Sequence, residues 1–113
     1  MPIEWSERIL VADLADEPHL SEELAAAHDR IASDEPAHSK DLVLNFTAVS
    51  YVSSSHLAQM LRLRKLIAER KRRLIVCGTS PDVMSVMTLT GLDRVFRFAQ
   101  DPSTALASLQ LED

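Results

Sequence analysis

Three consecutive serines, Ser53, Ser54 and Ser55, followed by His56, are the residues of this sequence best suited to chemistry or regulation. Serine hydroxyls can be phosphorylated, can cap a helix, or can act as nucleophiles when a histidine lies within reach. Adjacent residues of a helix point about 100° apart, and the nucleophile-elbow pattern Gly-x-Ser-x-Gly is missing. We therefore predict a binding or regulatory role and no enzyme, with a Ser/His hydrolase as an alternative that requires a substrate cavity beside His56.

The sequence contains no other group of residues with the spacing of a reactive site. The single cysteine, Cys77, cannot form an internal disulfide, and one cysteine with four scattered histidines matches no zinc-ligand pattern. Cys77 also lies within an apolar run, which is typical of an unreactive thiol in a core. Because no cofactor-binding motif is present either, we expect neither a metal nor a cofactor.

Four short apolar runs alternate with segments of helical periodicity, and both must position the serine cluster. The runs predict strands at residues 9–14, 42–46, 74–77 and 95–98. A helix is predicted after each strand. Ser21 is expected to cap the first helix, one of the three serines from Ser53 to Ser55 the second, and Ser80 the third, and Asp101-Pro102 is expected to open the last. This alternation predicts an α/β fold with a largely parallel or mixed sheet of about four main strands and packed helices.

Ligands and partners of parallel sheets meet the loops at the carboxyl ends of the strands. In this sequence two such loops carry hydroxyl groups: the serine cluster with His56, and the Gly78–Ser80 turn that includes Thr79. We therefore expect function at this edge of the sheet.

Size and composition narrow the class of protein. With 113 residues, 46% hydrophobic and 26% charged, the chain is predicted to be a single globular domain over residues 1–113. No apolar run approaches the roughly 20 residues that span a bilayer, and the first 20 residues carry acids where a secretory signal would be basic and then apolar. We expect a cytoplasmic protein without membrane insertion.

Charge is strongly segregated along the chain. Residues 1–41 contain eleven acidic and three basic side chains, whereas residues 62–73 contain seven basic side chains and only Glu69 as an acid. A basic run can attract nucleic acid, but this one has no aromatic residue to stack on bases and no recognised binding motif. We predict a solvated or partner-facing helix face and no nucleic-acid partner.

An ordered set of short motifs resembles a known family. The motifs are Leu44-Asn45-Phe46, Val49 to Leu57 around the serines, Arg73 to Cys77, Ser80-Pro81, and Leu89-Thr90-Gly91-Leu92-Asp93. In this order they resemble the STAS domain, and in particular the bacterial anti-sigma factor antagonists, over residues 42–109. Residues 1–41 resemble the family in outline only.

The resemblance implies a regulatory protein in a partner-switching pathway that acts on transcription. In the family, an anti-sigma factor serine kinase phosphorylates the serine at the position of Ser54, and the free form captures that kinase. It further implies a partner-binding surface comprising Ser53, Ser55, His56, Thr79 and Ser80. A phosphate at a helix start is stabilised by backbone N–H groups, and its charge of about −1.5 to −2 disrupts a docked interface.

Two positions differ from the family pattern: Ser53 stands where the family has Asp, and His56 where it has Gly. These differences favour the alternative of a STAS binding module that is never phosphorylated. Such modules are the scaffold proteins of stress-signalling assemblies and the small subunits of lipid-transport ABC complexes.

Overall fold

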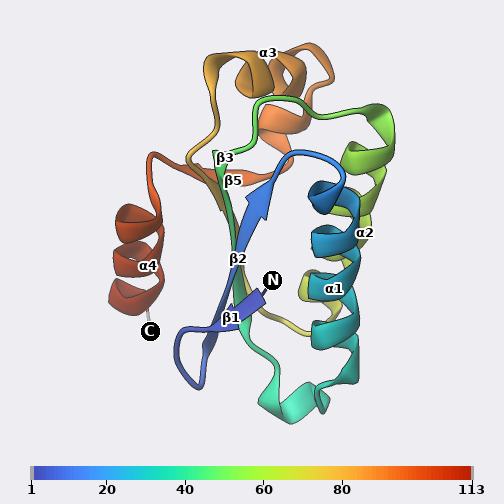
Figure 1. Cartoon of the computed structure of the whole chain (residues 1–113). Coiled ribbons are helices and arrows are strands. Elements are labelled where there is room, and N and C mark those ends of the chain that lie inside the picture. The colour runs from blue at the N-terminus through green and yellow to red at the C-terminus, as the bar shows by residue number, and fades with distance from the viewer. Residues whose placement is uncertain (1, 113) are drawn as a thin grey trace.

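The computed structural model describes residues 2–112, which form a five-stranded sheet with helices on both faces (Figure 1). The strands are β1 (Pro2–Glu4), β2 (Ile9–Ala15), β3 (Asp41–Ala48), β4 (Leu74–Cys77) and β5 (Arg97–Ala99). The α-helices are α1 (His19–Ser33), α2 (Ser54–Glu69), α3 (Pro81–Leu89) and α4 (Pro102–Leu111). Two 3-10 helices, η1 (Pro36–His38) and η2 (Leu92–Arg94), lie in the connections.

The strands follow their sequence order across the sheet, β1-β2-β3-β4-β5. The strands from β2 to β5 run parallel, and β1 pairs antiparallel with β2 at the edge. The α/β fold with four parallel main strands and four helices is therefore confirmed. Sequence reasoning missed β1 and placed the last strand at 95–98, because Phe96 is apolar; in the structure Phe96 turns into the core and the strand begins at Arg97.

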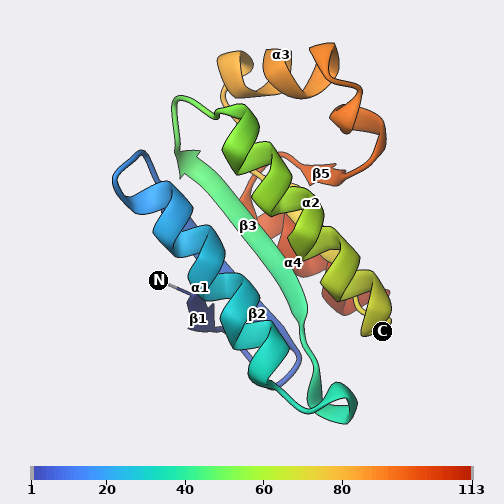
Figure 2. The same ribbon diagram turned by 90° about the vertical axis from the view of Figure 1, so that its right-hand side faces the viewer.

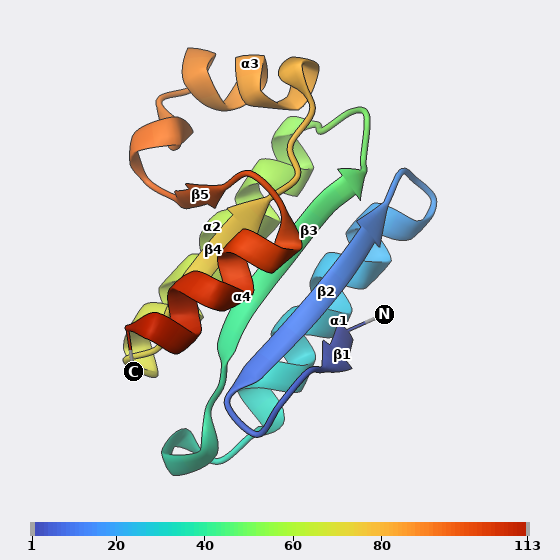
Figure 3. The same cartoon turned by 90° about the vertical axis from the view of Figure 1, so that its left-hand side faces the viewer.

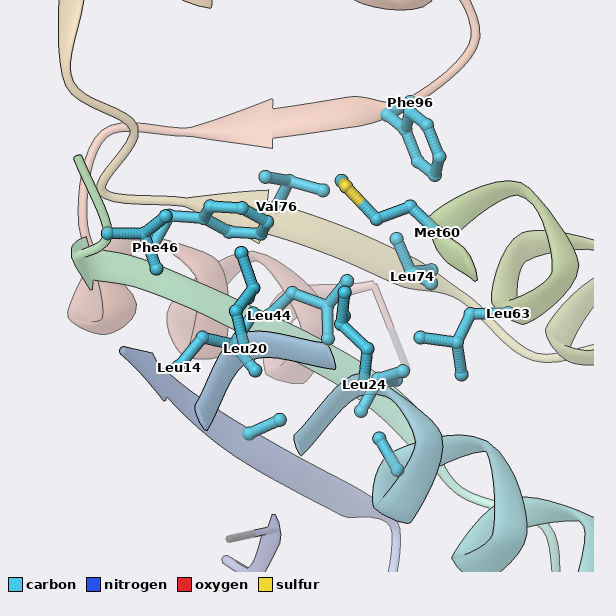
Figure 4. Close-up of a cluster of buried hydrophobic side chains, with 14 of the residues drawn as sticks. Leu14, Leu20, Leu24, Leu44, Phe46, Met60, Leu63, Leu74, Val76 and Phe96 are labelled. Atoms are coloured by element: carbon cyan, nitrogen blue, oxygen red, sulfur yellow. The ribbon is translucent and has the colours of Figure 1, made fainter. Parts of the chain in front are cut away.

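Helices α1 and α2 lie side by side on one face of the sheet, as Figure 2 shows, and α3 crosses the end of the sheet near the start of α2. Helix α4 covers β3 and β4 on the opposite face (Figure 3). Side chains along β3 alternate between the two faces of the sheet. Leu42, Leu44 and Phe46 point toward α1 and α2, and Val43 packs toward α4. Figure 4 shows the larger of the two cores, which also buries Met60 of α2.

Cys77 lies in the smaller core beside α4 and is fully buried. Burial raises the pKa of its thiol to about 11, with smaller contributions from the nearby charges of Asp101 and Asp13. Because the thiolate is the reactive form, the structure agrees with the prediction of an inert core thiol.

The predicted starts of the last three helices are confirmed, and the structure selects Ser53 among the three serines that could cap α2. The side chains of Ser53, Ser80 and Asp101 each accept a hydrogen bond from a backbone N–H three residues later. The predicted Ser21 cap of the first helix is wrong: α1 begins two residues earlier, and Ser21 instead donates both its N–H and its hydroxyl to Glu17.

The basic run is solvated only in part: Arg62, Arg64, Lys65 and Lys71 are exposed as predicted, whereas the other three arginines contribute to the fold. The guanidinium of Arg70 donates to three carbonyls at the end of α1, those of residues 31, 32 and 34. Arg73 donates its backbone N–H and its Nη2 to the two oxygens of Asp41, at 2.8 and 2.6 Å, and Arg72 Nη2 lies 3.0 Å from the same carboxylate. These cations join the acidic first half of the chain to the turn before β4.

None of the helices in residues 2–112 combines the length and apolar character needed to cross a bilayer.

Candidate functional site

The serine cluster divides into one engaged and two exposed hydroxyls. Ser53 is half-buried and precedes α2 in an extended conformation, where its side chain accepts from the His56 N–H at 3.4 Å. Ser54 and Ser55 occupy the first two positions of α2 and are exposed. The prediction that a serine of this cluster caps the helix is confirmed; the structure places Ser53 in that role, and the exposed hydroxyl directly after it belongs to Ser54.

His56 completes a capping box and is almost fully buried. Its Nδ1 accepts a hydrogen bond from the Ser53 backbone N–H at 2.9 Å, and its Nε2 lies 2.9 Å from Oε1 of Glu17. A backbone N–H can only donate, so Nδ1 carries a lone pair, and the imidazole proton lies on Nε2 and is donated to Glu17. His56 thereby joins the start of α2 to the loop before α1. We call Ser53, His56 and Glu17 the capping junction.

The capping junction superficially resembles a Ser-His-acid triad, since Ser53 Oγ lies 3.1 Å from His56 Nδ1. However, the lone pair of Nδ1 is already engaged by the Ser53 N–H, which leaves no free base for the hydroxyl proton. His56 also lines none of four pockets on the surface of residues 2–112. The arrangement therefore acts as a helix cap and lacks the geometry expected of a hydrolase.

Two carboxylates that were not predicted from the sequence, Asp16 and Glu17, accept hydrogen bonds at the carboxyl ends of the strands. Asp16 accepts from the Ser50 N–H at 2.8 Å, from the Ser50 hydroxyl at 2.6 Å and from the Tyr51 N–H at 3.3 Å. The hydrogen bonds from Ser50 hold the pKa of Asp16 below its usual value. Bonds from the Ser21 backbone, followed by the His56 side chain, likewise lower the pKa of Glu17. Both carboxylates are thus maintained as anions that fix the connection between β3 and α2.

The second predicted loop lies beside the first, because it follows the neighbouring strand β4. Ser80 is half-buried and caps α3, accepting from the Val83 N–H at 3.2 Å, and Thr79 is half-buried. Gly78 adopts a φ of +71°, and a Cβ there would lie 2.5 Å from Thr47 Oγ1. Glycine is therefore required for the close approach of the ends of β3 and β4.

Apolar side chains accompany these loops on the outside of the molecule. Tyr51 is 67% exposed directly before the serine cluster, and Leu89 at the end of α3 is 86% exposed. A shallow pocket of about 430 Å³ on α3 is lined by Met84, Leu89 and their neighbours Pro81, Ser85 and Thr88. Within the described part of the chain, no three His, Cys, Asp or Glu side chains cluster as metal ligands would.

A family model for the STAS domain matches residues 10–105, which is most of the chain. The chain belongs to the STAS domain family. The match includes residues 10–41, where the sequence resembles the family in outline only.

Solved structures of STAS proteins have the same fold. An anti-sigma-factor antagonist STAS domain protein from Planctomyces limnophilus is 16% identical, with 97% of each chain covered and a TM-score of 0.81. RsbS from Moorella thermoacetica, carrying a serine-to-glutamate substitution, is 18% identical, with 97% of this chain and 93% of that chain covered and a TM-score of 0.81. A chain from a structure of the stressosome, described as a signal integration and transduction hub, is 18% identical, with 97% and 96% covered and a TM-score of 0.75.

Proposed function

We propose that this STAS domain is a cytoplasmic protein-binding regulator of the anti-sigma factor antagonist type, switched by phosphorylation of Ser54. The observation that carries the proposal is the difference between neighbouring hydroxyls: Ser53 is held in the capping junction, whereas Ser54 is exposed at the first position of α2. A kinase needs a hydroxyl that is accessible and whose modification leaves the fold intact. Ser54 meets both requirements.

Phosphate on Ser54 would be tolerated by the helix and unfavourable in an interface. The dipole of a helix favours an anion at its N-terminus by about 0.3 to 1 kcal/mol. An unpaired charge forced into a docked surface costs about 2 to 5 kcal/mol, and each 1.4 kcal/mol is tenfold in affinity. The same group therefore leaves the domain folded and releases its partner, which is how a small modification acts as a switch.

The surface around Ser54 has the character of a protein-docking site. Tyr51 and Leu89 supply exposed apolar area, and Ser55, Thr79 and Ser80 supply polar groups at the same edge of the sheet. Exposed aromatic residues are enriched among the residues that contribute most to protein interfaces. We propose an anti-sigma factor serine kinase as the partner, with neither catalysis nor nucleic-acid binding by this domain.

A STAS module that is not phosphorylated is the second candidate. The capping position is taken by Ser53 in place of the family's Asp, so no carboxylate lies beside the Ser54 hydroxyl at this point of the chain. The likeness to a stressosome chain supports a scaffold role of this kind. Both candidates use the same edge of the sheet and differ in whether Ser54 is modified.

The test combines the genomically linked serine kinase with ATP, maps phosphate by mass spectrometry and measures binding by calorimetry. We expect phosphate on Ser54, binding of Ser54→Ala without modification, and a loss of affinity for Ser54→Asp of about 30-fold to several thousand-fold. Ser55→Ala is the matched control, since it removes an equally exposed hydroxyl one position later.

Two results would contradict the switch. Phosphate on Ser53 or Ser55, or undiminished binding of Ser54→Asp, would show that Ser54 is not the regulatory hydroxyl. Intact binding without any phosphate would identify the unphosphorylated module instead.

A further inference from the structure

We infer that a binding site for a phosphate-class oxyanion lies at the amino ends of the parallel strands, opposite the end of the sheet that carries Ser54. The site is a pocket of about 540 Å³ between the β1–β2 turn, η1 and the turn before β4. Three cations, Arg8, Lys40 and Arg72, line it together with Glu4 and Glu7. This volume lies within the range of small-molecule sites.

Lys40 is the first cation of this pocket whose charge the carboxylates of the chain compensate only in part. Only 11% of its side chain is exposed, and a lysine is rarely buried to this extent unless it is paired. Its one ion pair within residues 2–112 is with Glu4 Oε1 at 3.9 Å, beyond hydrogen-bond distance. The other oxygen of Glu4 accepts from Arg30 at 2.9 Å, so Glu4 is shared between two cations. The charge of the Lys40 ammonium is therefore only partly compensated.

Arg72 shows the same deficit on the other side of the pocket. Its nearest carboxylate, Asp41, is fully buried and already accepts two hydrogen bonds from Arg73. Arg72 Nη2 lies 3.0 Å from Asp41 Oδ2, but without the alignment of a hydrogen bond, and Arg72 Nε has no hydrogen-bond partner in the described residues. One carboxylate thus serves two guanidinium groups.

Arg8 adds an exposed cation on the β1–β2 turn, and its guanidinium pairs with no carboxylate in the described part of the chain. Glu7, the remaining acid of the lining, is exposed on the same turn. Lys40 and Arg72 are partly removed from solvent and share their carboxylates with other cations, and a bound anion would offset the cost of that arrangement. A lysine ammonium next to arginine guanidinium groups suits the three equivalent oxygens of a phosphate group.

The test measures thermal unfolding in inorganic phosphate against sodium chloride at matched ionic strength, and repeats it with glycerol 3-phosphate as an organic phosphate. We expect phosphate to raise the Tm by about 3 °C or more at saturation, because a ligand that binds only the folded state stabilises it. In ¹⁵N-labelled protein the backbone signals of Ser39, Lys40 and Arg8 should shift on titration, and those of Ser54 should not.

Lys40→Met distinguishes an anion site from a structural ion pair. Methionine retains an apolar stem and removes the ammonium, so without phosphate we expect a Tm equal to or above that of the unmodified protein. The affinity of this variant for phosphate should be about tenfold lower than that of the unmodified protein. Arg8→Gln, at an exposed position where folding is not at risk, should weaken phosphate binding while leaving the phosphate-free Tm unchanged. Lys65→Gln, an exposed cation of α2 outside the pocket, is the matched control and should bind as the unmodified protein does.

Three outcomes would overturn the inference. An equal Tm in phosphate and chloride would show that no site exists. Equal phosphate effects in all variants would indicate general charge screening. A large loss of phosphate-free stability in Lys40→Met would assign Lys40 to its pair with Glu4. None of these outcomes bears on Ser54, so this inference and the proposed switch succeed or fail separately.

Discussion

At the carboxyl ends of the strands, two carboxylates that remain accessible to solvent, Asp16 and Glu17, accept hydrogen bonds from the connection between β3 and α2. At the amino ends, the carboxylate Asp41 is fully buried and pairs with Arg72 and Arg73. Both junctions join segments more than 30 residues apart. The first leaves hydroxyl groups exposed beside it, while the carboxylate of the second is enclosed by its two arginine partners, one of which, Arg72, also lines the amino-end pocket.

The two junctions therefore differ in how strongly they hold the ends of the sheet together. A buried ion pair is costly to assemble and strongly destabilising to break, so the amino-end junction suits a permanent connection. Hydrogen bonds to exposed carboxylates contribute less and adjust more easily, and this character of the carboxyl edge is compatible with the charge at Ser54 that the proposed switch would add.

The largest effect should come from removing the buried charge at the amino ends. Asp41→Asn leaves Arg72 and Arg73 facing a neutral amide, and we expect a loss of about 3 kcal/mol in the free energy of unfolding, measured by urea denaturation. Glu69→Gln, an exposed acid at the end of α2, is the control and should change stability by less than about 0.5 kcal/mol. A loss for Asp41→Asn no greater than that of the control would remove the distinction between the two edges.

A smaller effect should follow from disrupting the capping junction. His56→Ala removes a buried ring, leaves the Ser53 N–H without its acceptor, and should cost about 2 kcal/mol in the same measurement. His56→Gln places at this position a side chain that accepts from the N-cap N–H in ordinary capping boxes, so it should recover part of the loss. If the glutamine variant were as unstable as the alanine variant, packing alone would explain the role of His56.

The smallest effect should appear as a pH dependence at the carboxyl edge. The pKa values of Asp16 and Glu17 are lowered in the folded protein, so the unfolded chain takes up protons first as the pH falls. Their stabilising contribution is complete above their usual pKa of about 4 and is lost as the pH falls through the lower folded values. Comparing acid unfolding of the unmodified protein with Asp16→Asn/Glu17→Gln should show a shallower acid slope in the variant. Identical slopes would mean that these carboxylates do not contribute.

Local signals in the sequence predicted much of this structure. The apolar run at 74–77, the cap supplied by the serine cluster, and the helix starts at Ser80 and Asp101 lie where expected, because strand burial and capping depend on neighbouring residues. The contacts from Asp16 to Ser50 and from Glu17 to His56 were not predictable. They join residues 34 and 39 positions apart, and they form only once the register of β2 and β3 is set. No spacing rule selects the right acid among eleven in residues 1–41.

The same limit applies to the basic run. Composition indicated a cluster of positive charge, but three of the four partners of Arg70 are backbone carbonyls at the end of α1, which any sequence would offer, and the fourth is the Ser39 hydroxyl. Only the packing of α1 beside α2 brings them within reach. The position of Ser54 was predictable from an ordered motif, whereas the reason that Ser53 is held and Ser54 is exposed required the structure.

The buried thiol in β4 can serve as a native probe of how often α4 separates from the sheet. Cys77 is the only cysteine in the chain, and it lies in a central strand with its reactive form suppressed. An alkylating reagent can modify it only when the layer formed by α4 separates from the sheet. The rate of labelling therefore reports the frequency of that opening, without any engineered probe.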